Sequence, residues 1–240
     1  MNPASLSTRL GRLFSPGAVV ATLREPGDPQ QLLPEEAAHL GRAVPKRRQE
    51  FAAGRLCARR ALAEFGMPDF PVRVAEDRQP IWPDSMAGSI THTAGFCAAV
   101  VAERRRIQAL GLDSELVGDV KPEIWPHICL PDEIAWLRSL PASEQAPAAT
   151  LIFSAKEAFY KCQYPVVHER LDFPDVRIEA AEWGASEGVF RIHPTRSIAI
   201  AAQRSLPMQG RYLFHERFVT AGMDLAGADE ESAASAESAQ

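Results

Sequence analysis

Two acidic residues stand two positions apart in the segment Gly111-Leu112-Asp113-Ser114-Glu115. The apolar residues before them predict a strand over 107–115, in which residues two apart project from the same face. Asp113 and Glu115 would then present two carboxylates side by side, and these repel unless a cation lies between them. Mg²⁺ prefers such hard oxygen ligands. The pair indicates a magnesium site, and two solvated acids at a strand end are the simpler alternative.

A further acid and a lysine lie in residues 153–161, Phe-Ser-Ala-Lys-Glu-Ala-Phe-Tyr-Lys, within a predicted helix over 147–160. Glu157 and Lys161 are four residues apart and therefore share a helix face. Glu157 would be a third metal carboxylate or a general base, and Lys161 would neutralise a phosphate. Two structural alternatives compete with this hypothesis. Ser154 and Glu157 have the spacing of a capping box, and Glu157 with Lys161 that of a surface ion pair.

Basic residues dominate the predicted helix over 46–65, where Arg48, Arg55 and Arg59 fall on one narrow arc at about 100° per residue. Phe51 and Leu62 border that arc, and apolar neighbours are unusual for a solvated cationic face. Arginines directed at a phosphate over a partly apolar wall fit this pattern. A charged surface helix is the alternative.

Hydroxyl side chains flank a histidine in the segment Gly88-Ser89-Ile90-Thr91-His92-Thr93-Ala94-Gly95. The alternation predicts a hairpin over 87–102 that turns at 93–95. Thr91 and His92 could hold an anion through hydroxyl and imidazole donors, although a lone histidine is more often structural. The chain has no G-x-S-x-G elbow, no Walker A loop and no G-x-G-x-x-G loop.

The elements that must position these residues alternate between helices and strands. Helices are predicted from Pro34 and over 46–65, 131–140 and 147–160; strands are predicted at 176–178, 189–192, 198–201 and 212–219 in addition to those above. This mixed order predicts an α+β fold of two lobes, 1–108 and 109–224. Residues 226–240 lack large apolar side chains, and we expect a disordered acidic tail over 225–240.

Composition limits the function classes. The 240 residues carry a formal net charge of −5, which argues against bulk nucleic-acid binding. No stretch approaches the roughly 18 apolar residues of a membrane span, and we expect no signal peptide. The four cysteines, Cys57, Cys97, Cys129 and Cys162, are far apart and predict reduced thiols in the cytoplasm.

Four segments together resemble the 4'-phosphopantetheinyl transferase superfamily, and more narrowly its large, two-lobed, enterobactin-synthase-component type. They are K-R-R-Q-E-F-A-A-G-R-L-C-A-R-R-A-L (46–62), W-P-x₄-G-S-I-T-H-T (82–93), L-G-L-D-S-E (110–115) and F-S-A-K-E-A-F-Y-K (153–161). Each segment is weak alone, but their ordered set is specific. Ser114 departs from the aliphatic residue of many relatives, and we expect it to point away from the acidic face.

The resemblance implies a pseudo-twofold monomer of two similar α+β lobes, with coenzyme A in the cleft between them. It implies that Asp113, Glu115 and Glu157 hold Mg²⁺. It also implies a coenzyme A site, for which the matching residues are Arg48, Arg55, Arg59, Arg78, Thr91, His92 and Lys161. Among the arginines we favour Arg55, and Arg78 is the least certain match.

The implied reaction transfers the phosphopantetheine arm of coenzyme A to a serine of an acyl or peptidyl carrier protein and releases 3',5'-ADP. The serine hydroxyl attacks the β-phosphate, Lys161 stabilises the leaving side, and Glu157 or a water that it orients takes the proton. Asp113 belongs to the same catalytic group. The kinship suggests siderophore or other secondary-metabolite carriers.

We expect the carrier to dock beside residues 116–130, where Trp125, Ile128 and Leu130 are candidate contacts, with core packing as the alternative. Two other functions compete with the transferase. One is a metal-dependent phosphohydrolase that uses the same carboxylates on a nucleotide. The other is a catalytically silent coenzyme A-binding or scaffold protein.

Overall fold

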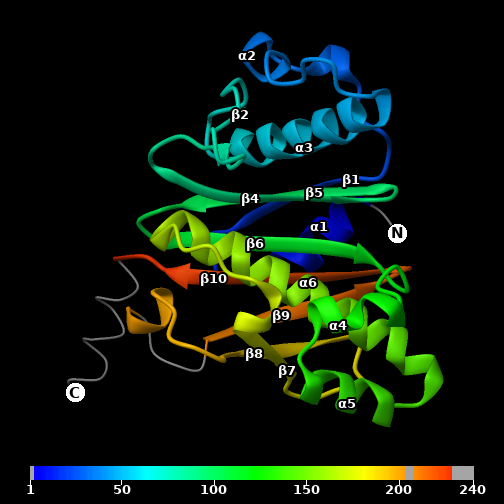
Figure 1. Ribbon diagram of the computed structural model, residues 1–240. Coiled ribbons are helices and arrows are strands. Elements are labelled where there is room, and N and C mark those ends of the chain that lie inside the picture. Colours follow the sequence, from blue (N-terminus) through cyan, green and yellow to red (C-terminus); the bar gives the residue numbers. More distant parts are fainter. Residues whose placement is uncertain (1–2, 204–207, 229–240) are drawn as a thin grey trace. The chain divides into compact units, whose positions relative to one another are not determined.

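The computed structural model describes residues 3–203 and 208–228 (Figure 1). The chain divides into two compact units, one running to Leu110 and including the segment from Asp224, the other Gly111–Met223. Each unit combines helices with antiparallel strands, which confirms the α+β class. Of the tail expected over 225–240, residues 229–240 lie outside the described residues, whereas 225 and 226 end a strand.

A three-stranded antiparallel sheet forms the first unit, in the order β1 (Val19–Leu23), β5 (Phe96–Glu103), β4 (Met86–Thr93). Helix α3 (Pro45–Ala63) covers one face, and α1 (Pro3–Gly11) packs on the other (Figure 1). Strands β4 and β5 form the predicted hairpin, in which Thr93 pairs with Phe96.

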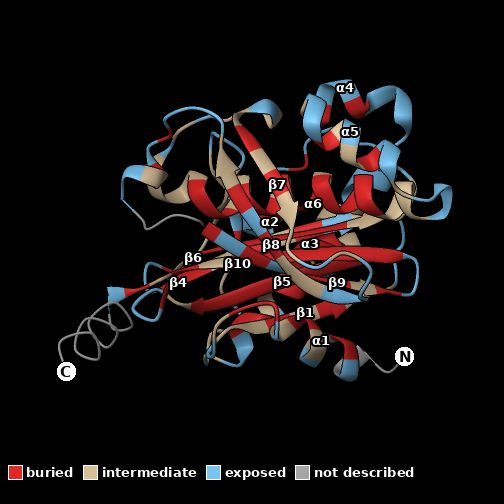
Figure 2. Cartoon of the chain, turned by 90° about the horizontal axis from the view of Figure 1, so that it is seen from below, coloured by how far each residue is buried: buried red, intermediate tan, exposed pale blue. Residues whose placement is uncertain are grey.

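The core of this unit lies between α3 and the sheet. On the helix, Ala53, Cys57 and Ala61 recur every four residues and face alternate residues of β5 such as Ala99 and Val101. Nearly the whole of β5 is buried (Figure 2). Small side chains on α3 allow this close contact with the sheet. Because they occupy the face toward the sheet, the arginines of α3 project from its other faces.

Four short elements precede and follow α3: η1 (Pro29–Gln31), α2 (Pro34–Ala37), β2 (Arg73–Val74) and β3 (Pro80–Ile81). They are tied together by Glu36 on α2, which is buried. Its carboxylate accepts the backbone N–H groups of Leu33 (3.0 Å) and Val72 (3.1 Å) and forms an ion pair with Arg59 of α3. One carboxylate thus joins the start of α2, the chain entering β2 and the middle of α3.

The second unit is built on a five-stranded sheet in the order β6-β10-β9-β8-β7. Its strands are β6 (Ile107–Leu116), β7 (Val176–Ala180), β8 (Glu187–Pro194), β9 (Met208–His215) and β10 (Phe218–Ala226). Its helical elements are η2 (Pro122–Ile124), α4 (Trp125–Ile128), α5 (Pro131–Ser139), α6 (Ala142–Val167), η3 (Phe173–Asp175) and η4 (Ile200–Ala202). Helix α6 packs on this sheet and on α5.

The second unit repeats the arrangement around Glu36. Glu133 of α5 is buried, and its carboxylate accepts the N–H groups of Leu130 and Ile178, both at 2.7 Å, and the ammonium of Lys156 at 2.8 Å. The glutamates (36 and 133) and their basic partners (59 and 156) are each 97 residues apart in the sequence. Both glutamates belong to a Leu-Pro-acid-Glu segment.

Three local predictions were wrong. The segment expected as a strand over 198–201 has no strand and leads into the 3₁₀ helix η4. The strand expected over 212–219 is a hairpin that turns after His215. Helix α6 runs through Pro147 and Pro165 instead of stopping. Each interior proline costs about 3 kcal/mol or more, but α6 buries side chains such as Leu151 and Phe159, worth about 1.5–3 kcal/mol each.

No helix in the described part of the chain has both the length and the apolar character needed to cross a membrane.

Candidate active site

Strand β6 and helix α6 approach closely because residue 111 is glycine. A Cβ at Gly111 would overlap the carbonyl oxygen of Ala158 and lie 2.8 Å from the Cβ of Cys162. Any larger residue would push the helix away from the strand. The glycine of the segment 110–115 therefore serves packing, and it brings the end of β6 within reach of the side chains of α6.

Asp113 and Lys161 form an ion pair between these two elements. The Lys161 ammonium donates to Asp113 Oδ1 at 2.6 Å, and it lies 3.4 Å from the carbonyl oxygen of Leu112. Asp113 is only 3 % exposed. The Ser154 hydroxyl of α6 donates to the backbone oxygen of Asp113 at 3.1 Å. Three contacts thus fix the acidic residue of β6 against the middle of α6.

Ser114 lies on the opposite face of β6. Its hydroxyl is 2.7 Å from that of Thr220 on β10, which is 2.8 Å from His215 Nε2. All three residues are buried. Ser114 therefore faces away from the two acids, as the alternation of a strand predicts, and its departure from the family pattern leaves the acidic face unchanged.

Glu115 and Glu157 belong to the same electrostatic group. Burial lowers the pKa of Lys161, but the charges of Asp113, Glu157 and Glu115, with the Asp113 hydrogen bond, outweigh burial and raise it. Burial raises the pKa of Glu157; the Lys161 charge opposes this rise, and the Asp113 charge adds to it. Three carboxylates and one ammonium, drawn from β6 and α6, thus influence one another at a single place.

The residue types in this group fit Mg²⁺, because carboxylate oxygens are its preferred protein ligands and because three acids share one ammonium. The side chains are not gathered as a ligand cage. Within residues 3–203 and 208–228, no three His, Cys, Asp or Glu side chains are grouped closely enough to hold a metal ion. The cation that contacts Asp113 is Lys161.

The two structural alternatives for this segment are not what the structure shows. Ser154 lies in the interior of α6, so it does not cap the helix with Glu157. The hydrogen bond of its hydroxyl goes to Asp113 on the neighbouring strand. The ion pair of Lys161 likewise crosses to Asp113 instead of running along the helix surface. Both side chains join two elements, as expected of a site.

A pocket of about 260 Å³ opens beside Glu157. Helix α6 supplies one part of its lining and the segment leading into β7 supplies the other: Lys156, Glu157, Phe159 and Tyr160, with Leu171, Asp172, Phe173 and Val176. Most of these side chains are apolar, and Glu157 is the titratable group in the lining with a raised pKa. Of the acidic group, Glu157 is the member that lines this pocket.

The three arginines predicted on α3 differ in their surroundings. Arg55 is buried, donates to the carbonyl oxygen of Val72 at 2.6 Å, and lies over the Phe51 ring at 4.1 Å; burial lowers the pKa of its guanidinium to about 10. Arg59 pairs with Glu36. Arg48 is exposed near the start of the helix. The structure thus gives Arg55 and Arg59 packing partners within the protein.

His92 lies close to the first turn of α3, where Arg47 Nη1 donates to His92 Nε2 at 3.0 Å. This bond requires an unprotonated Nε2, because a guanidinium has no acceptor. His92 and Lys46 also line a pocket of about 160 Å³ with Gly27, Gln49 and Thr93 among others. Arg47 was not among the predicted site residues, and its signal in the sequence was its place among the basic residues at the start of the helix.

Thr91 and Arg78 are placed differently. Thr91 is 2 % exposed and does not line the pocket of His92. Arg78 is exposed in the turn between β2 and β3, with a positive φ of 74°. The structure therefore brings His92, but not these two residues, to the pocket at the start of α3.

Two of the three candidate contacts in the docking segment 116–130 are buried in the protein. Trp125 and Ile128 are buried, and the Trp125 indole donates to the carbonyl oxygen of Val120 at 3.2 Å. Their role as surface contacts was wrong, and core packing explains them. Leu130 is half-buried. The exposed large apolar side chain of this segment is Ile124, at 39 %.

The chain is similar to known proteins over most of its length. Residues 35–102 match the model of the 4'-phosphopantetheinyl transferase N-terminal domain, and residues 109–213 match that of the 4'-phosphopantetheinyl transferase superfamily. The chain is 38 % identical to the 4'-phosphopantetheinyl transferase Svp of Streptomyces mobaraensis over 213 residues, 87 % of this chain and 86 % of that protein. It is 31 % identical to the 4'-phosphopantetheinyl transferase Npt of Nocardia iowensis over 211 residues, 85 % and 93 % of the two chains.

The chain belongs to the 4'-phosphopantetheinyl transferase superfamily. The narrower resemblance covers less of it: enterobactin synthase component D of Salmonella typhi is 40 % identical over 119 residues, 48 % of each chain. The protein is therefore an enzyme that transfers phosphopantetheine from coenzyme A to a carrier protein, as the four sequence segments predicted. Membership favours the transferase over a phosphohydrolase or a silent coenzyme A-binding protein.

Proposed function

We propose that Asp113, Glu115, Glu157 and Lys161 carry out a Mg²⁺-dependent transfer of phosphopantetheine to a carrier serine. The observation that carries this proposal is the 2.6 Å ion pair of Lys161 with Asp113 where β6 meets α6. Glu115 and Glu157 lie near enough to add to the rise in the pKa of Lys161. Asp113, Glu115 and Glu157 would hold the ion, and their side chains would have to move closer together to do so, because among the described residues they are not grouped as a ligand set. When bound, Mg²⁺ would withdraw negative charge from the pyrophosphate of coenzyme A.

Glu157 is the proposed general base. The serine hydroxyl oxygen bonds to the β-phosphorus of coenzyme A, the bond from that phosphorus to the bridging oxygen breaks, and 3',5'-ADP leaves. The serine proton passes to Glu157. Without the ion, burial and the Asp113 charge raise the pKa of Glu157, whereas a bound cation would lower it. A water that Glu157 orients is the alternative base. Lys161 stabilises negative charge on the leaving side.

The arm of coenzyme A is proposed to enter the pocket of about 260 Å³ that Glu157 borders. Its lining is mostly apolar, like much of the arm, and one end adjoins the acidic group. The phosphates at the nucleotide end are proposed to bind residues of the first unit. His92, Arg48, Arg55, Arg59, Arg78 and Thr91 are the matching residues, and the pocket that His92 and Lys46 line favours His92 among them.

The organisation of the whole molecule is part of the proposal. We propose two similar lobes, 1–108 and 109–224, in a pseudo-twofold monomer with the active site in the cleft between them. The repeated arrangement of Glu36 and Glu133 supports two similar lobes. The four cysteines are free, in keeping with the cytoplasm as the place of action. An acyl or peptidyl carrier would dock beside 116–130, with Ile124 as an exposed contact.

Intact-mass analysis of purified carrier domains tests the function. Siderophore, polyketide and fatty-acid carriers are each incubated with the enzyme, coenzyme A and Mg²⁺. We expect a gain of one phosphopantetheine arm on at least one carrier, and none when a chelator removes the ion. Rapid release of 3',5'-ADP without any carrier would instead identify a phosphohydrolase.

A further inference from the structure

The ion pair of Lys156 and Glu133 is almost completely removed from solvent, with side chains 1 % and 2 % exposed and 2.8 Å between Nζ and Oε2. The desolvation cost of such a pair often cancels its attraction, so a buried pair is weak evidence for stability. Neither residue belongs to the acidic group at Asp113. Their function must therefore be sought in what the pair holds in place.

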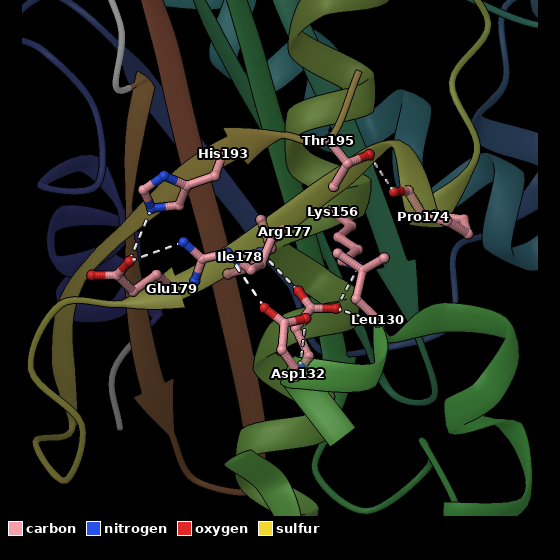
Figure 3. Close-up of polar contacts among 10 residues, drawn as sticks. Leu130, Asp132, Lys156, Pro174, Arg177, Ile178, Glu179, His193 and Thr195 are labelled. Atoms are coloured by element: carbon pink, nitrogen blue, oxygen red, sulfur yellow. Dashed lines mark hydrogen bonds and ion pairs between the residues drawn. The ribbon is translucent and has the colours of Figure 1, made fainter. Parts of the chain in front are cut away.

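The side chains of Lys156 and Glu133 form hydrogen bonds to several separate elements. The three protons of the Lys156 ammonium go to Glu133, to the carbonyl oxygen of Ile128 (2.8 Å) and to that of Phe173 (3.0 Å). Glu133 binds the N–H groups of Leu130 and Ile178. Figure 3 shows Lys156, Leu130 and Ile178 converging on this point. The pair joins the end of α4, the start of η3 and the start of α5 to α6 and β7.

One of these bonds joins the two parts of the pocket beside Glu157. Lys156 and Glu157 line it from α6, and Phe173 lines it from η3. The bond from Lys156 Nζ to the Phe173 carbonyl therefore spans from one part to the other. The rings of Phe153 and Phe173, with centroids 5.5 Å apart, add an apolar contact. Without the ammonium, residues 171–173 (the Phe173 segment) would lose this hydrogen bond to α6.

We propose that Glu133 and Lys156 are positioning residues for the arm of coenzyme A: they hold the Phe173 segment at the distance from α6 that the arm requires. The inference rests on the proposed function of this pocket. The equivalent pair of the first unit, Glu36 and Arg59, differs in what it holds, because Arg59 donates its other bond to the carbonyl oxygen of Gln31 at 2.7 Å. The pocket connection is specific to Lys156.

The test separates positioning from stability with the double variant E133Q/K156M. E133Q alone leaves a buried ammonium without its counter-charge and should lower the thermal midpoint. The double variant removes both charges and should recover much of the loss, because well-packed apolar replacements of buried ion pairs are often neutral. It still lacks the donor to Phe173. Glu144→Gln is the matched control. Glu144 lies on α6, the helix that carries Lys156, and it accepts a hydrogen bond from the Trp183 indole at 2.7 Å.

Binding of two ligands is then measured by calorimetry without any carrier. In E133Q/K156M we expect the Kd of coenzyme A to rise about tenfold, a loss of roughly 1.4 kcal/mol, and that of 3',5'-ADP, which has no arm, to stay the same. In E144Q both values should be unchanged. An unchanged Kd for coenzyme A, or an equal rise for both ligands, would overturn the proposal.

A second variant keeps the test decisive if the double variant does not fold. Lys156→Met alone leaves Glu133 with both backbone N–H donors, and the same two titrations apply to it. The wild-type mass gain on a carrier is read separately. Its absence would refute the proposed function, whereas a normal mass gain with an unselective change in binding would refute only the positioning role.

Discussion

Lys161 of α6 and Asp113 of β6, 48 residues apart in the sequence, are joined by a 2.6 Å contact between Nζ and Oδ1. This contact ties the end of the strand to the middle of the helix. It also places one ammonium among three acids, because Glu115 and Glu157 raise the pKa of Lys161 as well.

Asp113→Asn should abolish most transfer. The change removes a proposed ligand and the carboxylate that holds Lys161, so we expect kcat/KM to fall by at least about 10³-fold, roughly 4 kcal/mol of barrier. The assay is the rate of mass gain on a carrier. Ser114→Ala is the control on the opposite face of β6. It loses the bond to Thr220, worth about 1 kcal/mol of stability, and should keep its activity.

The stability of Glu157→Gln relative to the wild type should increase as the pH rises. In the folded state the pKa of Glu157 lies above its ordinary value of 4.5. The folded wild type therefore has its full stability below that ordinary value, and it loses stability as the pH rises through the folded pKa. Glutamine does not ionise. The free energy of unfolding of the variant relative to the wild type should therefore increase between about pH 4 and pH 7. A difference that stays constant or decreases would contradict this assignment.

Gly111→Ala should damage both folding and activity. The new Cβ would overlap the carbonyl oxygen of Ala158, and overpacking of this kind costs about 1–3 kcal/mol. The helix must move away from β6, which lengthens the contact of Asp113 with Lys161. Denaturant unfolding and transfer rate are measured together. Gly11→Ala, at a position without a positive φ where a Cβ meets nothing within 4 Å, should leave the rate unchanged.

Arg47→Ala should weaken the binding of coenzyme A and of 3',5'-ADP equally. Arg47 bonds to His92 at the pocket proposed for the nucleotide phosphates, and a lost charge-assisted contact of about 1.4 kcal/mol corresponds to a tenfold higher Kd. Both Kd values are measured by calorimetry. Arg60→Ala changes an exposed arginine later on the same helix and should change neither. Selective loss of coenzyme A binding alone would count against a phosphate role.

Much of the site was predictable because its signals are local. Alternation placed Asp113 and Glu115 on one face of a strand, and the spacing of Glu157 and Lys161 placed them on one face of a helix. Proline was misleading in α6, since the signal that stops a helix cannot be weighed against burial without knowing what the helix packs on. Trp125 and Ile128 were misjudged for the same reason: an apolar residue does not reveal whether protein or solvent covers it.

The pair of Glu133 and Lys156 was missed because its partners are remote. Glu133 is bound by backbone groups of Leu130 and Ile178 and by a lysine 23 residues away, and no short pattern encodes such a set. A signal did exist in the repeat of Leu-Pro-acid-Glu at 33–36 and 130–133. Its spacing of 97 residues is far longer than the 20–50 residues at which repeats are usually sought.

The most direct test of the central claim is the stoichiometry of divalent ion binding. Mn²⁺, as a stand-in for Mg²⁺, is titrated into the protein with coenzyme A present, and bound ion is counted by electron paramagnetic resonance. We predict one bound ion per chain for the wild type and loss of that ion in each of D113N, E115Q and E157Q. Retention of the ion by all three variants would show that these carboxylates do not share it.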